Sequence, residues 1–140
     1  MEFLSPLGVN SHHMKLNPIQ IARYALGLSW LYQGFFPKLW TIAPLERQLT
    51  ATMGFSIPLS DLITRGAGVG EMTFGMLLIV FYKVKTIHLL NIMALVGLLL
   101  YVLFMMPTLL IEAFNPVTTN LTMIALSLVL ISHIDSSKPS

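Results

Sequence analysis

Glu71 is the residue with the clearest potential for chemistry, and it closes a run of alternating glycines in the stretch RGAGVGEMTFG, residues 65–75. A dinucleotide-binding loop requires Gly-x-Gly-x-x-Gly between a strand and a helix. Here the spacing is Gly66-x-Gly68-x-Gly70, no βαβ pattern surrounds it, and no Walker-type lysine follows. The stretch is instead typical of a membrane helix that contains a carboxylate.

The glycines divide between two faces of this predicted helix. At about 100° per residue, Gly68 and Gly75 share a face with Glu71, whereas Gly66 and Gly70 lie on another. Small residues allow membrane helices to approach closely. The glycines predicted to pack against neighbouring helices, here and in the first apolar segment, are Gly27, Gly34, Gly66, Gly68, Gly70 and Gly75.

The depth of Glu71 needs a physical account. It lies about nine residues into the predicted span, or roughly 13 Å at about 1.5 Å per residue. A charged side chain at the centre of a span costs about 2.5–3.5 kcal/mol on insertion scales. The carboxylate should therefore face the bundle and be either paired or protonated. The sequence leaves open whether its role is functional or that of a structural salt bridge.

Several polar residues are expected near the same membrane face as the start of this helix. Long basic side chains at that face can extend along the helices towards Glu71. Arg23 lies nearer the opposite face and is a further candidate partner. The predicted polar pocket, which opens towards the exterior, consists of Gln33, Lys38, Arg65, Glu71, Glu112 and Asn115. His88 and His133 are expected at membrane interfaces, and no metal site is predicted.

The composition explains why these residues must be positioned by membrane helices. Of 140 residues, 55% are hydrophobic and 10% are charged, whereas globular proteins carry about 25% charged residues. The mean hydropathy is +0.77. A net charge of +2 without a basic run argues against nucleic acid. The chain has no cysteine, which excludes disulfide and thiol chemistry by its own residues.

The apolar segments predict an all-α, integral membrane four-helix bundle. Asn-Pro pairs at 17–18 and 115–116 are typical helix starts, Ser60 or Asp61 is expected to cap the second helix, and Pro37 to follow the end of the first. A short interfacial helix is expected within LERQLTATMGF.

The predicted spans are 18–36, 62–82, 88–106 and 116–134. They form one membrane domain over 17–135, with a disordered tail over 1–16 and a C-terminal tail over 136–140. Met1 and Met14 both remain candidate starts.

Two further expectations concern packing and orientation. The third span is expected to make contacts through Ala94, Gly97 and Tyr101, and the fourth through a stripe that includes Thr118 and Thr122. The balance of basic residues in short flanks favours cytoplasmic termini. Lys15, Lys83, Lys85 and Lys138, with Arg23, lie on the side of the termini, and Lys38, Arg47 and Arg65 lie on the other.

Three motifs in this order resemble the DoxX-like family of small bacterial membrane proteins. They are Gly34-Phe-Phe-Pro37-Lys38 at the exit of the first span, Gly68 with Glu71 and Gly75 in the second, and Phe114-Asn115-Pro116 before the last. The resemblance covers about residues 17–134. It implies a four-helix protein of the bacterial inner membrane. Some members are linked to quinone-coupled sulfur oxidation as the small subunit of a thiosulfate:quinone oxidoreductase, and others to oxidative-stress complexes.

Two functions follow from the residues and the resemblance together. The first is an accessory subunit of a quinone-linked redox complex or of a stress-related complex, which holds a quinone or lipid headgroup near Lys38, Arg65 and Glu71. Its expected partner is a larger redox subunit or a second copy of the chain. The alternative is a small-solute or proton-linked carrier in which Glu71 changes its protonation. No covalently bound cofactor is expected. An independent enzyme is the least favoured reading, because no nucleophile or metal constellation is present.

Overall fold

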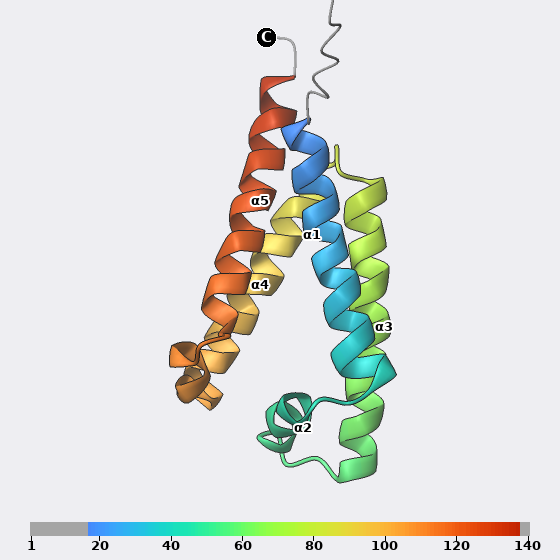
Figure 1. The fold of residues 1–140 in the computed structure, drawn as a ribbon, viewed down its shortest axis with the longest axis vertical. Coiled ribbons are helices and arrows are strands. Elements are labelled where there is room, and N and C mark those ends of the chain that lie inside the picture. Colours follow the sequence, from blue (N-terminus) through green and yellow to red (C-terminus); the bar gives the residue numbers. More distant parts are fainter. Residues whose placement is uncertain (1–16, 138–140) are drawn as a thin grey trace, which may run out of the picture.

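A computed structural model describes residues 17–137, which are helical and contain no strand (Figure 1). The predictions for residues 1–16 and 138–140, including Lys15 and Lys138, lie outside the described residues. The α-helices are α1 (Pro18–Gly34), α2 (Pro44–Ala51), α3 (Ile57–Val80), α4 (Lys85–Met105) and α5 (Pro116–Ser136). A π-helical segment, Phe35–Trp40, continues α1, and a short 3₁₀ helix, Pro107–Ile111, precedes α5.

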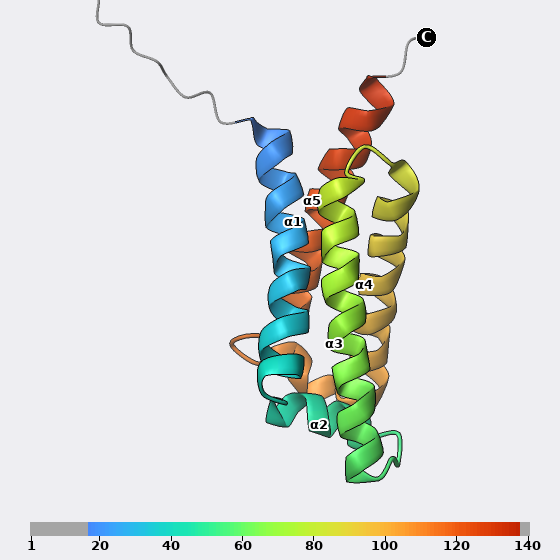
Figure 2. The same ribbon diagram turned by 90° about the vertical axis from the view of Figure 1, so that its right-hand side faces the viewer.

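The four long helices form two pairs. α1 packs along α3, α4 packs along α5, and α1 also contacts α5. Figures 1 and 2 show that the pairs lie close together near the two ends of the chain and diverge towards the opposite end, where α2 lies across the gap. We call these the terminal end and the α2 end of the bundle.

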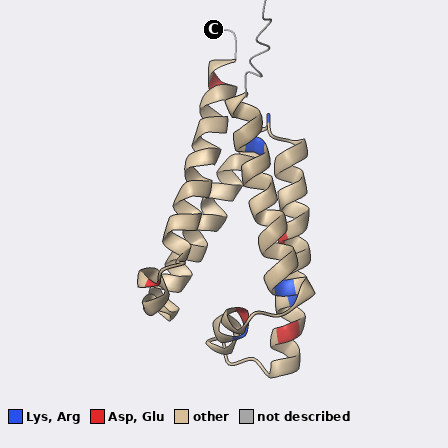
Figure 3. Ribbon diagram, viewed as in Figure 1, with Lys and Arg blue, Asp and Glu red and all other residues tan. Residues whose placement is uncertain are grey.

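Three helices of the described chain, α3, α4 and α5, are long and apolar enough to cross a membrane. The protein is therefore an all-α membrane protein. The α-helical part of α1 has 17 residues, or about 26 Å at roughly 1.5 Å per residue, slightly less than a hydrocarbon core of about 30 Å. That α1 also spans stays a prediction. Figure 3 shows the charged residues mainly near the two ends of the bundle.

The helix starts follow the capping chemistry expected from the sequence at two of three sites. Asn17 accepts a hydrogen bond from the Ile19 amide at 3.0 Å, and Asn115 accepts one from the Thr118 amide at 3.0 Å. The predicted start of the second span was wrong. α3 begins at Ile57, because Pro58 fits the first turn of a helix, so neither Ser60 nor Asp61 is a cap.

Pro37 follows the end of α1 at Gly34, as expected, but the chain continues there as a π-helical turn. The backbone widens there into the π-helical segment, in which the Thr41 amide donates to the Phe36 carbonyl at 3.3 Å and the Ala43 amide to the Pro37 carbonyl at 2.9 Å. Proline is accommodated because its missing N–H falls at the start of the wider turn. The short helix predicted in the long connection is present as α2.

The hydrophobic core lies towards the terminal end. Its members come from α1, α3, α4 and α5 and are Ala22, Leu26, Trp30, Leu78, Ile87, Leu95, Met123 and Leu130. The stripes predicted for the last two spans were largely wrong: Ala94, Gly97, Thr118 and Thr122 are exposed, and only Tyr101 among the residues named makes the expected contact, donating to the Leu49 carbonyl of α2 at 2.7 Å. The buried positions of α4 and α5 include polar residues instead. His88, which was expected at an interface, is fully buried.

The seam between α1 and α3 depends on four glycines. A Cβ added to Gly34 would lie 2.5 Å from the Gly68 carbonyl oxygen, and one added to Gly75 would lie 2.7 Å from that of Gly27. Only glycine permits this backbone approach. Gly66 and Gly70, in contrast, have no neighbouring atom within 4 Å. The second contact face predicted for this helix is thus not formed by the described chain.

Candidate functional site

Lys38 is the centre of a charged cluster at the α2 end. Its ammonium group forms an ion pair with the Glu71 carboxylate of α3 and lies 3.6 Å from the Glu46 carboxylate of α2. All three side chains are largely removed from the surface, with 12%, 19% and 20% of the side chains of Lys38, Glu71 and Glu46 exposed. The cluster joins three segments of the chain and carries two carboxylates for one ammonium group.

The local backbone explains how Lys38 reaches Glu71. The π-helical segment carries Lys38 past the end of α1, and the absent side chain of Gly68 leaves room for it. A Cβ at Gly68 would lie 2.9 Å from the Lys38 Cβ. The close α1–α3 seam therefore does more than pack two helices, because it lets the lysine stem pass over α3 towards the carboxylate.

The electrostatics of the cluster are unbalanced. When all three groups are ionised its net charge is −1, and the second Glu71 oxygen, Oε2, is buried with no hydrogen-bond partner among the described residues. Burial raises the pKa of the Glu46 carboxyl above its ordinary value of 4.5; the Lys38 charge opposes this shift and the Glu71 charge adds to it. The Glu46 carboxyl, which lies outside the spanning helices, therefore binds a proton more tightly than a free glutamate does.

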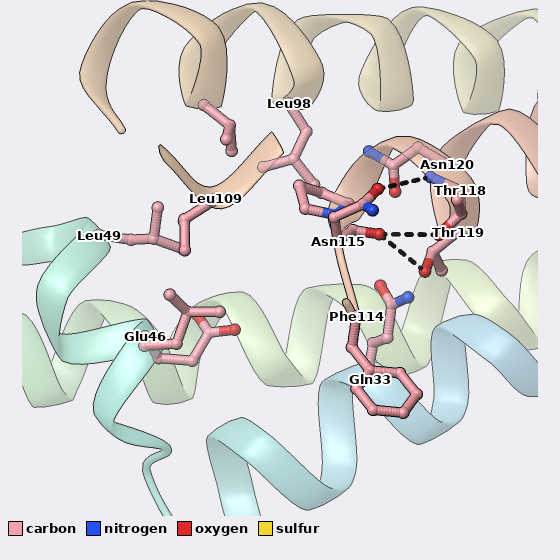
Figure 4. Close-up of a pocket in the computed structure, with 13 residues that line it drawn as sticks. Gln33, Glu46, Leu49, Leu98, Leu109, Phe114, Asn115, Thr118, Thr119 and Asn120 are labelled. Atoms are coloured by element: carbon pink, nitrogen blue, oxygen red, sulfur yellow. Dashed lines mark hydrogen bonds between the residues drawn. The ribbon is translucent and has the colours of Figure 1, made fainter. Parts of the chain in front are cut away.

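A pocket of about 260 Å³ lies beside this cluster, next to α2 and between the two helix pairs (Figure 4). Its walls are largely apolar. In Figure 4 the side chains of Gln33 from α1 and Glu46 from α2 both extend into it. The lining residues are Gln33, Leu45, Glu46, Leu49, Leu98, Val102, Leu109, Phe114, Asn115, Pro116, Thr118, Thr119 and Asn120.

Most polar groups of the pocket are already used within the fold. Asn115 caps α5 through its Oδ1 and donates its Nδ2 to the Glu112 carbonyl at 2.8 Å. Asn120 donates to the Leu95 carbonyl at 3.4 Å. Thr118 and Thr119 donate to the Asn115 carbonyl. Two side chains, the Gln33 amide and the Glu46 carboxyl, therefore remain best placed to recognise a polar group in the pocket.

The other predicted site residues lie apart from this pocket. Arg65 is exposed and donates to the Leu39 carbonyl at 3.2 Å. Glu112 is also exposed, and its backbone carbonyl accepts the hydrogen bond from Asn115. Arg23 lies at the terminal end, where it donates to the Ile79 carbonyl at 2.6 Å and stacks 4.1 Å from the Tyr82 ring centroid. The predicted single pocket is therefore two adjoining features, the Lys38–Glu71 pair and the Gln33–Asn115 wall, with Glu46 between them.

Sequence reasoning did not identify Glu46, which belongs to a helix expected only to lie on the membrane surface. It also missed a buried hydrogen-bond chain across the core. The Trp30 indole donates to Asn91 Oδ1 at 2.7 Å, and Asn91 Nδ2 donates to Ser127 Oγ at 2.8 Å. The asparagine in an otherwise apolar span could have revealed this hydrogen-bond chain, because polar side chains inside membrane bundles hydrogen-bond across helices.

Comparison with known proteins assigns the chain to a family. Residues 17–137 define a small all-α membrane protein with a charged cluster and an apolar pocket at one end, and they contain no group of three His, Cys, Asp or Glu that would hold a metal ion. The sequence matches the DoxX-like family over residues 27–128, and the chain belongs to that family. No curated protein and no solved structure gave a significant match.

Proposed function

We propose that the protein is a non-catalytic membrane subunit that holds the ring of a quinone beside a larger redox partner. The observation that supports this most directly is the pocket, in which the Gln33 amide and the Glu46 carboxyl extend between apolar walls. Ligand sites of this kind combine a largely apolar lining with a few polar groups that fix orientation. The pocket volume, about 260 Å³, suits a single ring more than an extended molecule.

The two polar groups fit the chemistry of a quinone. A quinone ring presents two carbonyl oxygens, and the Gln33 amide is a donor for one of them. The Glu46 carboxyl accepts a hydrogen bond when ionised and donates one when protonated, so it suits both the oxidised and the reduced ring. A quinone bound there supplies two-electron redox chemistry. The residues of this chain orient the ring and hold a proton at the Glu46 carboxyl.

The experiment is a binding measurement on the purified protein in detergent. A short-chain ubiquinone analogue is expected to raise the thermal unfolding midpoint in a saturable manner and to give a measurable Kd by calorimetry. Gln33→Leu should weaken binding and leave the unliganded midpoint close to that of wild type. Gln48→Leu is the matched control, because Gln48 is an exposed glutamine of α2 that does not line the pocket. Equal binding by both variants would contradict the proposal.

Membrane and partner assignments belong to the same proposal. We place the protein in the bacterial inner membrane, as the family resemblance implies, with cytoplasmic termini, as the balance of basic residues along the sequence favours. A C-terminal reporter active only in the periplasm would reverse this orientation. Affinity purification from native membranes should recover a larger redox subunit; recovery of the chain alone, as a homo-oligomer, would count against an accessory role.

A proton-linked carrier for a small solute is the second candidate, and the unbalanced charge of the cluster favours it. One ammonium group serves two carboxylates, and Glu71 Oε2 has no partner among the described residues. Such an arrangement can exchange a proton during transport. Uptake into proteoliposomes should then collapse in Glu71→Gln. If a correctly inserted Glu71→Gln protein keeps its cellular phenotype, Glu71 has a structural role.

A further inference from the structure

A furrow along the seam between α1 and α5 continues the pocket away from α2. Two hollows, of about 480 and 360 Å³, follow one another along this seam. The first shares Gln33 and Thr119 with the pocket, and the second shares Ala25, Ser29 and Thr119 with the first. The three spaces therefore adjoin one another along α1, from Gln33 towards Ala25.

The furrow is chemically apolar although several of its residues carry hydroxyl groups. Ser29 donates to the Ala25 carbonyl at 2.7 Å, and Thr122 donates to the Thr118 carbonyl at 2.8 Å. Thr118 and Thr119 donate to the Asn115 carbonyl at 3.1 and 3.5 Å. Each of these serine and threonine hydroxyls thus bonds to a carbonyl of its own helix or its cap. The Tyr32 ring also lines the furrow, so the surface left for a ligand is mainly hydrocarbon, which suits an apolar chain.

The dimensions and direction of the furrow also suit a chain. Ala25, Ser29 and Gln33 are spaced four residues apart on one face of α1, so the wall they form is about 12 Å long at roughly 1.5 Å per residue. Both hollows are open at the protein surface along the α1–α5 seam, and the surface of a membrane bundle faces lipid. A ligand moving along it would enter from within the bilayer.

The α2 end of the pocket is closed by comparison. Arg47 of α2 forms two hydrogen bonds with Asp61 of α3, each of 3.1 Å. On the other side, the Tyr101 hydroxyl of α4 donates to the Leu49 carbonyl of α2 at 2.7 Å. α2 is thereby fastened to both helix pairs beneath the pocket, which leaves the furrow as the more open route.

We propose that the furrow is a lateral portal that admits a quinone from the bilayer and holds its isoprenoid chain while the ring lies between Gln33 and Glu46. This rests on the proposed function, because the ring site supplies the polar end of the path. It names the ligand class more narrowly: a ring with hydrogen-bonding oxygens on one long apolar chain. A water-soluble solute has no apolar chain to bury in a hydrocarbon furrow that opens to lipid.

The test uses a quinone that carries a photoreactive diazirine on its chain, bound to the full-length protein in lipid nanodiscs. After irradiation, labelled residues are mapped by mass spectrometry. We expect labels on the furrow residues of α1 and α5, and their loss to background when excess unlabelled quinone is present. Ser29→Phe and Thr122→Phe, which fill the furrow at two positions, should also reduce furrow labelling to background.

Thr73→Phe is the matched control for Thr122→Phe. Thr73 is an exposed threonine of α3 whose hydroxyl donates to the Val69 carbonyl at 2.9 Å, but it lies outside the furrow. It should leave furrow labelling unchanged. The short-chain analogue separates the two proposals. If the analogue binds but chain labels fall on α3 or are unaffected by both furrow variants, the portal is wrong and the ring site stands. If the analogue does not bind wild type, the proposed function fails as well.

Discussion

α1 packs against two neighbours in opposite ways. Its seam with α3 is so close that a Cβ at Gly34 would lie 2.5 Å from a backbone oxygen. Its seam with α5 contains the furrow, where hollows of about 480 and 360 Å³ open to the outside. The same helix therefore presents a rigid side, crossed by the Lys38–Glu71 ion pair, and a hollowed side that leads to the pocket.

The difference shows how a small membrane bundle can hold a site without losing its fold. Helices in lipid gain little from the hydrophobic effect and associate through close packing and hydrogen bonds. Here the close packing is concentrated between α1 and α3, and the hydrogen bonds of Trp30, Asn91 and Ser127 join α1 to α4 and α5 nearer the terminal end. The α2 end of the α1–α5 seam is left without either, so a ligand can occupy it.

The largest effect is expected on the rigid side from Lys38→Met. The substitution leaves the Glu46 and Glu71 carboxylates facing each other without a cation. Breaking a buried ion pair by removing one partner costs about 3–5 kcal/mol. The free energy of unfolding, measured by SDS titration in mixed micelles, should fall by an amount in this range, and Glu71→Gln added to Lys38→Met should recover part of the loss.

Arg65→Met is the control for this experiment. Arg65 is a basic residue near the same end, but it is exposed and bonds to a backbone carbonyl. Exposed substitutions away from special features usually change stability by less than about 0.5 kcal/mol. If Lys38→Met and Arg65→Met had equal effects, the charged cluster would not be part of what makes this side rigid.

The next effect concerns the glycines, and the chain supplies its own matched pair on α3. Gly68→Ala would place a Cβ 2.7 Å from the Gly34 oxygen, a backbone atom that cannot move aside cheaply. Overpacking of this kind costs about 1–3 kcal/mol, and we expect the upper part of that range. Gly70→Ala, with no atom within 4 Å, should be neutral or slightly stabilising, because alanine favours helices by up to about 1 kcal/mol over glycine. Comparable losses in the two variants would show that Gly70 also has a partner.

The sequence predicted the rigid side better than the hollowed side, for a physical reason. Gly68, Gly75 and Glu71 recur at helical spacing, and that periodicity placed them on one face towards a neighbour, as found. The depth of Glu71 also indicated that its carboxyl would be either paired or protonated, and it is paired with Lys38. Periodicity alone did not show that Gly66 and Gly70 face no neighbour. A repeat in the sequence identifies which residues share a face of the helix, but it does not show whether another helix packs against that face.

The hollowed side depends on tertiary arrangement that no local pattern encodes. Gln33 and Asn115 were predicted as neighbours from their shared membrane face, and both line the pocket. Glu46 was missed because its position depends on how α2 folds back beneath the bundle. The expected stripes of α4 and α5 were largely wrong because small residues were given more weight than Asn91, Asn120 and Ser127, whose polar groups require partners inside a bundle.

A smaller loss is expected from Asn91→Leu, which tests whether the hydrogen-bond chain holds α1 to α4 and α5. The substitution removes the bonds to Trp30 and Ser127. Interhelical hydrogen bonds in membranes average about 0.6 kcal/mol and reach about 1.7, so two of them predict a loss of about 1–2 kcal/mol in the same unfolding assay. Ser127→Ala, which removes one bond, should cost roughly half as much. If the Asn91→Leu protein were as stable as wild type, these two hydrogen bonds would not be what holds the helices together here.

The smallest effect concerns Glu46, which belongs to the charged cluster of the rigid side and to the wall of the pocket. Burial raises the pKa of its carboxyl above 4.5, so the folded protein binds this proton more tightly than the unfolded chain does. Between 4.5 and the raised pKa the folded state therefore holds more protons, and the contribution of Glu46 to stability declines as pH rises through that window. The stability of wild type relative to Glu46→Gln should fall across the window and then level off. If that difference rises with pH instead, the attraction of Lys38 outweighs the cost of burial, and Glu46 would act with the rigid side as a fixed anion.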